Sequence, residues 1–401
     1  FGEWDLGLGL RELWQRILQT GGVKIYGVFL GFVSISITTR FLGPEGRGHL
    51  VLITTWVTTF STFAFLSLGQ VTIHKASNSK GLSWLPSSYS CLTSFTVFAT
   101  LSCWLIFAIA YASPLGRAFE SVEVIWLILG FLTLPFLIWE QFGSSMLMAL
   151  ERLDVYNRFQ FFGRSFSTIV VVVLVYFLEF GPEGVLTANL LGQIIVALGG
   201  IVFLNKLAGG WKSPRLSCMK EFVCSGMKLH MNAIGMFFIS GSDILVVNYY
   251  SGPEETAFYQ LSVKLIGVFL LLPQAANMVV YGKVSAVGPD QAWPAQRKIL
   301  LQLLVLMVIC ATVAGFSADW WLVLLAGKDF MPTVDIFCWS LLALFGMTFS
   351  VVMAPQWIAR GFFWTTSLLA LLFGGLNLVL NFMFVPEYGM YGALTATLIT
   401  Y

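Results

Sequence analysis

Residues 361–386 read GFFWTTSLLALLFGGLNLVLNFMFVP, and no charged residue lies between Arg360 and Glu387. A helix that crosses a bilayer needs about 20 mostly apolar residues, and this stretch is longer. A second stretch without charge extends from Lys80 to Arg117. Such long apolar stretches predict transmembrane helices rather than the amphipathic helices of a soluble core.

The composition of the whole chain agrees with this prediction. Of the 401 residues, 57% are hydrophobic and only 10% are charged, whereas a soluble domain carries about 25% charged residues. The polar residues are too few to cover a soluble surface, so lipid must be the solvent. The net charge of +2 and the lack of a basic tract argue against a nucleic-acid partner.

About twelve membrane-spanning helices are expected, which makes the chain an all-α polytopic membrane protein. Turn residues such as Gly-Pro and Pro-Glu separate the apolar runs. The last run is predicted to be a helix that is cut short. The runs cover residues 21–41, 50–70, 88–111, 123–149, 162–179, 185–205, 229–250, 256–281, 299–317, 333–358, 364–384 and 389–401.

The lysines and arginines predict the orientation, because loops on the cytoplasmic side carry an excess of both. With the N-terminus inside, 17 of these residues fall on the inner side and four on the outer side, and Lys264 alone lies within a span. The outer four are Arg40, Arg47, Arg117 and Lys328. The inner ones are Arg11, Arg16, Lys24, Lys75, Lys80, Arg152, Arg158, Arg164, Lys206, Lys212, Arg215, Lys220, Lys228, Lys283, Arg297, Lys298 and Arg360.

Short motifs recur at a nearly constant spacing, which predicts an internal duplication. The tripeptide Gly-Pro-Glu stands at 43–45 and again at 252–254, and Leu-Thr-Ala stands at 186–188 and again at 394–396. With six spans in each half, both halves insert the same way up, related by a pseudo-two-fold axis along the membrane normal. The predicted units are an N-terminal six-helix bundle over 1–205, a cytoplasmic linker over 206–228 and a C-terminal bundle over 229–401.

The loop motifs resemble those of a known family. The stretch TTRFLGPEGRG at 38–48, the residues ALER at 149–152 with Tyr156-Asn157, and SGSD at 240–243 followed by Gly-Pro-Glu are similar to polysaccharide flippases. These belong to the multidrug/oligosaccharidyl-lipid/polysaccharide (MOP) exporter superfamily. The resemblance implies two six-helix bundles around a central cavity and alternating access. The implied cargo is an oligosaccharide on an undecaprenyl-type pyrophosphate, in the cytoplasmic membrane of a bacterium or archaeon.

Charged residues inside spans are costly and usually face a cavity or a partner. Asp243 and Lys264 lie ten and eleven residues from Pro253 on consecutive spans, so both are expected at similar depth. They are predicted to form either an ion pair that closes this hairpin or a cavity-facing pair. In the second case Lys264 attracts pyrophosphate and Asp243 exchanges a proton or sodium ion.

Lys24 and Lys228 lie near the inner ends of the first and seventh spans and are matched as symmetry mates when a five-residue gap is allowed. They are expected either to reach the lipid headgroups or to hold pyrophosphate at the inner mouth of the cavity. His230 and Asn232 lie close by and are candidates for the same cavity or for contacts between helices.

Glu140 lies about ten residues from the inner end of the fourth span, near the middle of the bilayer. Two roles are open for it. It is either a neutral group that forms hydrogen bonds across helices or a proton carrier that couples transport to an ion gradient.

No nucleotide-binding loop, zinc-protease motif or nucleophile elbow occurs in the chain, and the loops are short. A transporter without enzymatic chemistry, cofactor or metal is therefore predicted, coupled at most to H⁺ or Na⁺. Its partners are the lipid-linked oligosaccharide, membrane lipids and proteins of polysaccharide assembly. The alternatives are a multidrug antiporter of the same superfamily and a membrane-embedded polysaccharide polymerase or ligase.

Overall fold

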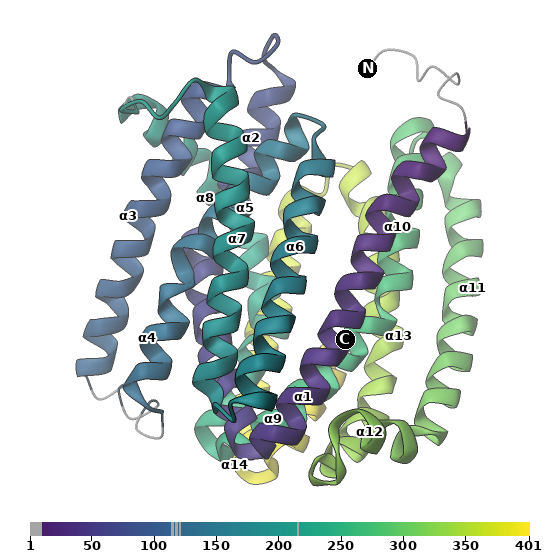
Figure 1. Ribbon diagram of the computed structural model, residues 1–401. Coiled ribbons are helices and arrows are strands. Elements are labelled where there is room, and N and C mark those ends of the chain that lie inside the picture. The colour runs from purple at the N-terminus through teal and green to yellow at the C-terminus, as the bar shows by residue number, and fades with distance from the viewer. Residues whose placement is uncertain (1–9, 114–115, 117–118, 120–121, 215) are drawn as a thin grey trace.

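The computed structural model describes residues 10–113, 116, 119, 122–214 and 216–401, without the side chains of residues 10–25, 279, 282, 285, 286 and 363. Most of this part is helical and none of it forms a strand, which confirms the all-α prediction. The long helices lie side by side in one bundle, with α2 at one end and α12 at the other (Figure 1). We call these two ends the α2 end and the α12 end.

Fourteen α-helices form the described part of the chain, with a π-helix after the sixth and a 3₁₀ turn after the twelfth. Several of them begin with a proline, which suits the first helical turn because it needs no N–H donor there. The helices are α1 Leu10–Ala64, α2 Leu68–Ser77, α3 Leu85–Ala112, α4 Val124–Leu132, α5 Leu134–Ala149, α6 Leu153–Val171, η2 Val172–Phe177, α7 Pro182–Ala208, α8 Leu216–Ser240, α9 Ser242–Phe269, α10 Leu271–Val287, α11 Pro289–Phe316, α12 Ala318–Ala326, η3 Lys328–Phe330, α13 Pro332–Ala359 and α14 Phe363–Thr400.

Within the described residues, nine helical stretches are long and apolar enough to cross a membrane. Three of them, at 26–64, 216–278 and 364–400, are much longer than one crossing requires. Each of these three contains a glycine with non-helical backbone angles. The chain is thus a multi-pass membrane protein, and the number twelve stays a prediction.

The turns inside α1 and α9 have the same local cause. Gly43 (φ 66°, ψ −177°) and Gly252 (φ 83°, ψ −175°) adopt angles that are essentially restricted to glycine. A proline follows each glycine, and its missing N–H removes a helical hydrogen bond. The repeated Gly-Pro-Glu motif therefore produces the same turn twice, 209 residues apart.

A contact between helices is repeated at the same spacing. In the first half, Tyr26 of α1 stacks on Phe161 of α6 and its hydroxyl lies 2.9 Å from Ser165 Oγ. In the second half, Gly235 of α8 packs against the backbone of Ala370 and Gly374 in α14, so closely that a Cβ atom on Gly235 would lie 2.6 Å from the Ala370 carbonyl carbon. All three positions are shifted by 209, which supports the predicted duplication from geometry rather than motif.

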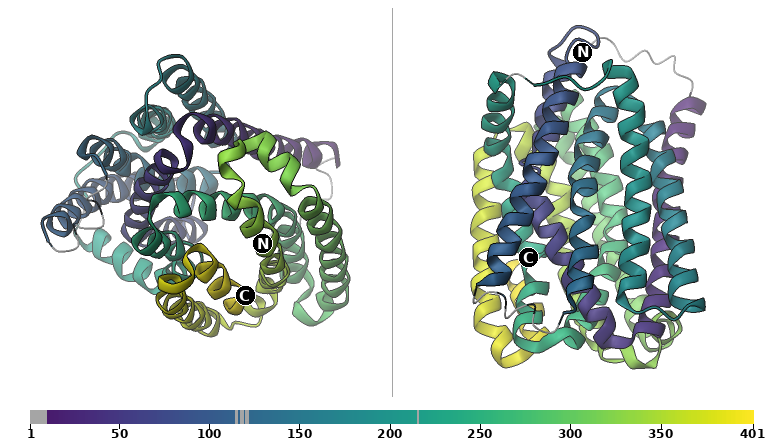
Figure 2. Two further views of the ribbon diagram at one scale, coloured as in Figure 1. Left: turned by 90° about the horizontal axis from the view of Figure 1, so that it is seen from below. Right: turned by 60° about the vertical axis from the view of Figure 1, so that its left-hand side comes forward.

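The buried side chains form two main clusters that follow the two halves. One consists of residues between Leu50 and Phe222, and the other of residues between Ile244 and Leu394 joined by Ile35 and Val51 of α1. Seen from the α12 end, the blue helices and the green helices occupy opposite sides (Figure 2, left). Helix α1 contributes to both clusters and connects the halves.

The predicted linker over 206–228 is mostly helical. Helix α7 continues to Ala208 and α8 begins at Leu216, so the first part of α8 is longer than the sequence reading allowed. Phe222 of α8 is buried in the core of the first half, because α8 packs beside α2. Of the residues used for the orientation, Arg117 and Arg215 lie outside the described residues, as do the side chains of Arg11, Arg16 and Lys24.

Candidate functional site

A polar cavity of about 550 Å³ lies within the first half. It is bounded by α1, the junction of α4 and α5, α6 and α7, and its size falls in the range of about 300–1,000 Å³ typical of small-molecule sites. Only five of its 22 lining residues have apolar side chains, which is unusual in a bundle so rich in apolar residues. The charged, amide and hydroxyl groups of the lining belong to Ser34, Thr54, Thr58, Thr133, Glu140, Gln141, Gln160, Arg164, Ser167, Thr168, Asn189 and Gln193.

Glycines create the space for this cavity. Gly27 and Gly31 stand on one face of α1 and both line it, since residues four apart in a helix share a face. A Cβ atom on Gly31 would meet no atom within 4 Å. On the opposite wall, a Cβ on either Gly163 or Gly192 would lie 2.8 Å from the other's carbonyl oxygen, so α6 and α7 are in direct backbone contact.

Glu140 of α5 is the acidic group of the cavity. The Tyr156 hydroxyl donates to Glu140 Oε1 at 2.8 Å, and the Gln160 and Gln193 amides also donate to the carboxylate. Donors from α6 and α7 thus meet the carboxylate of α5. The predicted position of Glu140 inside the bundle and its hydrogen bonding across helices agree with this arrangement.

Arg164 is the basic group of the cavity. It was expected in a loop on the inner side, but it lies within α6. Its Nη1 atom would lie 2.7 Å from a Cβ on Gly27, so the guanidinium rests on the glycine face of α1. No ion pair joins it to Glu140 within the described part of the chain. The available signal was the spacing of Gln160 and Arg164, which puts both on one helix face.

A second group of cations lies where the two halves meet. Arg47 of α1 is only 2% exposed, and its guanidinium donates to Thr38 Oγ1 (2.6 Å) and to Gln260 Oε1 of α9 (3.4 Å). Its Nε atom is buried without a partner. The expectation that Arg47 lies in an outer loop is therefore wrong, because α1 resumes directly after Gly43.

Lys264 belongs to the same region, because it lies on α9 one turn beyond Gln260. Its side chain is exposed although Ser262 and Leu265 beside it are buried, and Arg47 is close enough for the two cations to repel each other. No described residue forms an ion pair or a hydrogen bond with Lys264. The contact between the halves therefore contains two positive charges and no acidic partner for them within the described residues.

Asp243 is buried in the second half and forms no ion pair with Arg47 or Lys264. Its carboxylate accepts hydrogen bonds from the Tyr259 hydroxyl (2.8 Å), Thr397 Oγ1 (2.9 Å) and Asn381 Nδ2 (3.2 Å). The expected pairing of Asp243 with Lys264 does not form. The turn at Gly252 directs the two parts of α9 differently, and the buried face around Asp243 is completed by α14.

Asn377 completes the group around Asp243. One terminal atom of its amide lies 2.9 Å from Asp243 Oδ1, 3.1 Å from the Phe238 carbonyl oxygen and 2.8 Å from Asn381 Nδ2. With its oxygen there, three oxygens face one another without a hydrogen atom between them. With its NH₂ there, the amide donates to Asp243 Oδ1 and to the Phe238 carbonyl oxygen, so this orientation satisfies both acceptors. Asn381 Oδ1 is buried without a partner, so one acceptor of the cluster remains unpaired.

The other predicted residues lie apart from these groups. His230 of α8 is buried, with Nδ1 3.2 Å from Ser67 Oγ and Nε2 unpartnered, so it joins α8 to the junction before α2. Lys228 and Asn232 are exposed on α8, and neither lines the cavity of the first half. The side chain of Lys24 lies outside the described residues.

The matching of Lys24 with Lys228 as symmetry mates stays a prediction. The contacts at Tyr26 of α1 and Gly235 of α8 are spaced by 209 residues. Without a gap, this spacing makes Ala233 the position that corresponds to Lys24.

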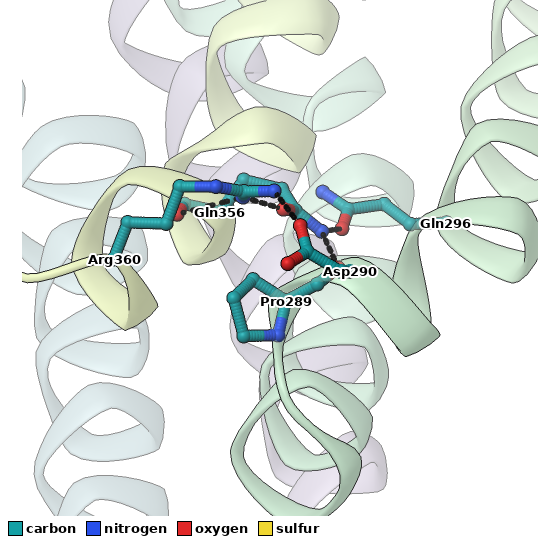
Figure 3. A network of polar contacts seen from close by, with 5 residues as sticks. All are labelled: Pro289, Asp290, Gln296, Gln356 and Arg360. Atoms are coloured by element: carbon teal, nitrogen blue, oxygen red, sulfur yellow. Dashed lines mark hydrogen bonds and ion pairs between the residues drawn. The ribbon is translucent and has the colours of Figure 1, made fainter.

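A polar network fixes the α2 end of the second half (Figure 3). Arg360 Nη2 donates to Asp290 Oδ1 at 2.6 Å, and Arg360 Nη1 donates to the Gln356 backbone and side-chain oxygens. The Gln356 amide donates to the Pro289 carbonyl oxygen (3.1 Å) and to Gln296 Oε1. The start of α11 is thus held against the end of α13.

Known proteins resemble this chain in sequence and in fold. A curated relative, the "Probable low-salt glycan biosynthesis flippase Agl15" of Haloferax volcanii, is 18% identical over 238 residues, which cover 55% of this chain. The chain spans 47% of the length of that relative.

Two solved structures share the fold over nearly the whole chain. The lipid II flippase MurJ in an inward closed conformation superposes with a TM-score of 0.80 at 14% identity, covering 96% of this chain and 85% of that one. An inward-facing multidrug resistance transporter of the MATE family, in the MOP superfamily, gives 0.69 at 11% identity, covering 93% and 92%. At these identities the likeness establishes the fold.

The family itself is established by a sequence match of a different kind. The model of the family described as "Polysaccharide biosynthesis protein" matches residues 13–281, more than half of the chain. This confirms the family predicted from the loop motifs. The chain belongs to the polysaccharide biosynthesis protein family and has the fold of the MOP transporters.

Proposed function

We propose that the protein flips a lipid-linked oligosaccharide, carried on an undecaprenyl-type pyrophosphate, across a cytoplasmic membrane by alternating access. The observation that carries this proposal is the pair of cations, Arg47 and Lys264, between the two halves. Charges are costly to hold within a membrane bundle unless a partner compensates them. Because no described acidic group does so, an anionic cargo is the partner that fits best.

The position of the two cations suits alternating access. Arg47 and Gln260 join α1 to α9 across the contact between the halves, so relative motion of the halves would change the surroundings of both Arg47 and Lys264. A pyrophosphate held there is a fixed point about which the halves can rock. Lysine contributes a point charge and arginine a planar set of donors.

The Asp243 cluster supports coupling to an ion gradient. A sodium ion is bound by oxygen atoms, and the carboxylate of Asp243, the hydroxyl of Thr397 and the Phe238 carbonyl bring oxygens together in this buried cluster. A proton on the buried carboxylate would neutralise its charge. The residues present therefore fit either H⁺ or Na⁺, and these oxygens would hold the ion.

Further partners and the location follow from the same proposal. Membrane lipids surround the bundle, and proteins of polysaccharide assembly supply and consume the cargo. The excess of Lys and Arg on one side supports a cytoplasmic N-terminus in a bacterial or archaeal cell membrane. No bond is made or broken, so no enzymatic step is proposed.

A multidrug antiporter is the second candidate, and Glu140 is the observation that favours it. An acidic group in a cavity of the first half could pair with a cationic drug. Against this, the same cavity contains Arg164, and three donors already surround the carboxylate.

A flipping assay in proteoliposomes separates the candidates. The lipid-linked oligosaccharide that accumulates in a strain lacking the gene is incorporated in one leaflet, and its arrival in the other is followed with a membrane-impermeant lectin. We expect Lys264→Ala to slow flipping at least tenfold, Lys264→Arg to retain most of it, and the exposed-site control Lys298→Ala to match the unchanged protein. Full flipping by Lys264→Ala would contradict the role of the cations, and transport of ethidium instead of the glycolipid would favour the antiporter.

A further inference from the structure

We propose that the cavity of the first half is the binding site for the saccharide of the cargo, with Glu140 selecting its hydroxyl groups. This inference rests on the proposed function but concerns a different place from the cations between the halves. It assigns the sugar and the pyrophosphate to separate sites. Its first support is composition, because amides, hydroxyls and one carboxylate line the cavity and are the groups that pair with sugar hydroxyls.

The carboxylate of Glu140 retains free capacity for a ligand. A carboxylate offers about four lone-pair positions. Tyr156 and Gln160 donate to Oε1, whereas Gln193 alone donates to Oε2. One position on Oε2 therefore stays open to a hydroxyl donor, and the three protein donors hold the acceptor rigidly in place.

Asn189 and Ser167 extend this polar wall along α6 and α7. Ser167 Oγ lies 3.4 Å from Asn189 Oδ1, and Asn189 is exposed although it lies within the bundle. No hydrogen bond to a described residue uses its NH₂ group, so this donor is free for a ligand. The wall thus offers both a donor and acceptors to the hydroxyl groups of a sugar ring.

The two charges of the cavity remain separate. Arg164 lies one helical turn beyond Gln160 on the same face of α6, yet it forms no ion pair with Glu140 within the described part of the chain. The side chain rests against Gly27 of α1 instead. The space between the charges is therefore left to a ligand that offers both donors and acceptors.

The corresponding positions of the second half form a buried cluster instead of an open cavity. At the spacing of 209 Asp243 corresponds to Ser34, and at the spacing of 208 given by the repeated Leu-Thr-Ala Thr397 corresponds to Asn189. Ser34 and Asn189 line the cavity, whereas Asp243 and Thr397 are hydrogen bonded to each other in a buried cluster. The duplicated site is thus closed around an acid in one half and open in the other.

Binding measurements with two probes test this assignment. The probes are undecaprenyl pyrophosphate without sugar and the lipid-linked oligosaccharide that accumulates in the deletion strain, each added to the purified full chain in nanodiscs. Gly31→Leu extends a side chain into the cavity from a position whose Cβ atom meets no protein atom within 4 Å. Glu140→Gln keeps the size of the side chain but removes the charge. The matched control is Gly375→Leu on α14, where a Cβ atom also meets nothing within 4 Å.

We expect Gly31→Leu and Glu140→Gln to weaken binding of the glycosylated probe at least tenfold, the effect of losing a hydrogen bond to a charged group. Binding of the bare pyrophosphate should be unchanged, and Gly375→Leu should bind both probes normally. Equal weakening of both probes, or of neither, overturns the assignment. If the unchanged protein binds neither probe, the proposed function itself fails. Lys264→Ala should weaken both probes, and unchanged binding of both by this variant would contradict the proposed function without bearing on the saccharide site.

Discussion

Gly48 of α1 and Pro253 of α9 are in backbone contact, so close that a Cβ atom on Gly48 would lie 2.0 Å from the Pro253 carbonyl oxygen. The two residues belong to the two copies of the repeated turn, one in each half. Around them, Arg40 donates to the Leu324 carbonyl oxygen of α12 (2.5 Å). The halves are therefore joined tightly at the α12 end.

A side chain at position 48 should force this contact open. We predict that Gly48→Ala separates the halves at the α12 end and slows flipping, because the obstructing atoms belong to the backbone and have little freedom to move. The measurement is the labelling rate of a cysteine placed at Thr39, which is only 1% exposed, by an impermeant thiol reagent. Gly31→Ala, with open space around its Cβ, should leave labelling slow, and slow labelling in Gly48→Ala as well would contradict the prediction.

Replacing either of the two turn glycines, Gly43 or Gly252, by alanine should destabilise the protein to a similar extent. Gly43→Ala and Gly252→Ala place a Cβ atom in a backbone conformation that costs about 1–3 kcal/mol for other residues. We expect each to lower the midpoint of thermal unfolding in detergent by a similar amount, followed by tryptophan fluorescence. The control Gly375→Ala lies in a regular helix, where alanine is favoured over glycine by about 1 kcal/mol, so a lower midpoint there would indicate that helix propensity does not govern these sites.

Sodium binding should depend on Asp243. A ligand that binds only the folded protein stabilises it, by about 2.7 kcal/mol at a concentration of 100 times Kd. We predict that NaCl raises the unfolding midpoint relative to choline chloride, and that Asp243→Asn abolishes this difference. Asp290→Asn removes an exposed carboxylate and should keep the sodium response. If neither protein responds to sodium but flipping follows a pH gradient, the proton is the coupled ion.

The network at Arg360 should derive its strength from the buried amide rather than from the ion pair. Asp290 is largely exposed, and exposed ion pairs contribute about 0–1 kcal/mol. Gln356 is only 4% exposed and bonds to three residues. Its replacement by alanine leaves buried groups unpaired, at about 1–3 kcal/mol. We therefore expect Gln356→Ala to lower the unfolding midpoint more than Asp290→Ala. High salt should reduce only the effect of Asp290→Ala, because salt screens exposed charges.

The sequence was sufficient to predict the all-α membrane class, the recurrence of the Gly-Pro-Glu turn and the family. Apolar length fixes a spanning helix almost by itself, and the repeated Gly-Pro-Glu motif has one backbone solution, which appears at both Gly43 and Gly252. Glu140 could be placed because its depth in the span follows from counting residues. These predictions depend only on distance along the chain.

The contacts of the charged residues could not be predicted in the same way. Arg47 and Arg164 were assigned to loops because the ends of continuous helices carry no sequence signal when both sides are helical. The partners of Asp243 in α14 lie 138 and 154 residues away. Which face of α9 meets α14 is set by packing, and helices that are apolar on every side do not reveal that face.

The approach of Gly48 to Pro253 has a consequence for the rate at which the molecule can change its shape. When two surfaces interlock through long side chains, these side chains must return to the same rotamers each time the surfaces meet. At the closest point between the halves, the backbone of Gly48 lies directly against the backbone of Pro253. The two halves can therefore separate and come together again repeatedly without any rearrangement of side chains at this point.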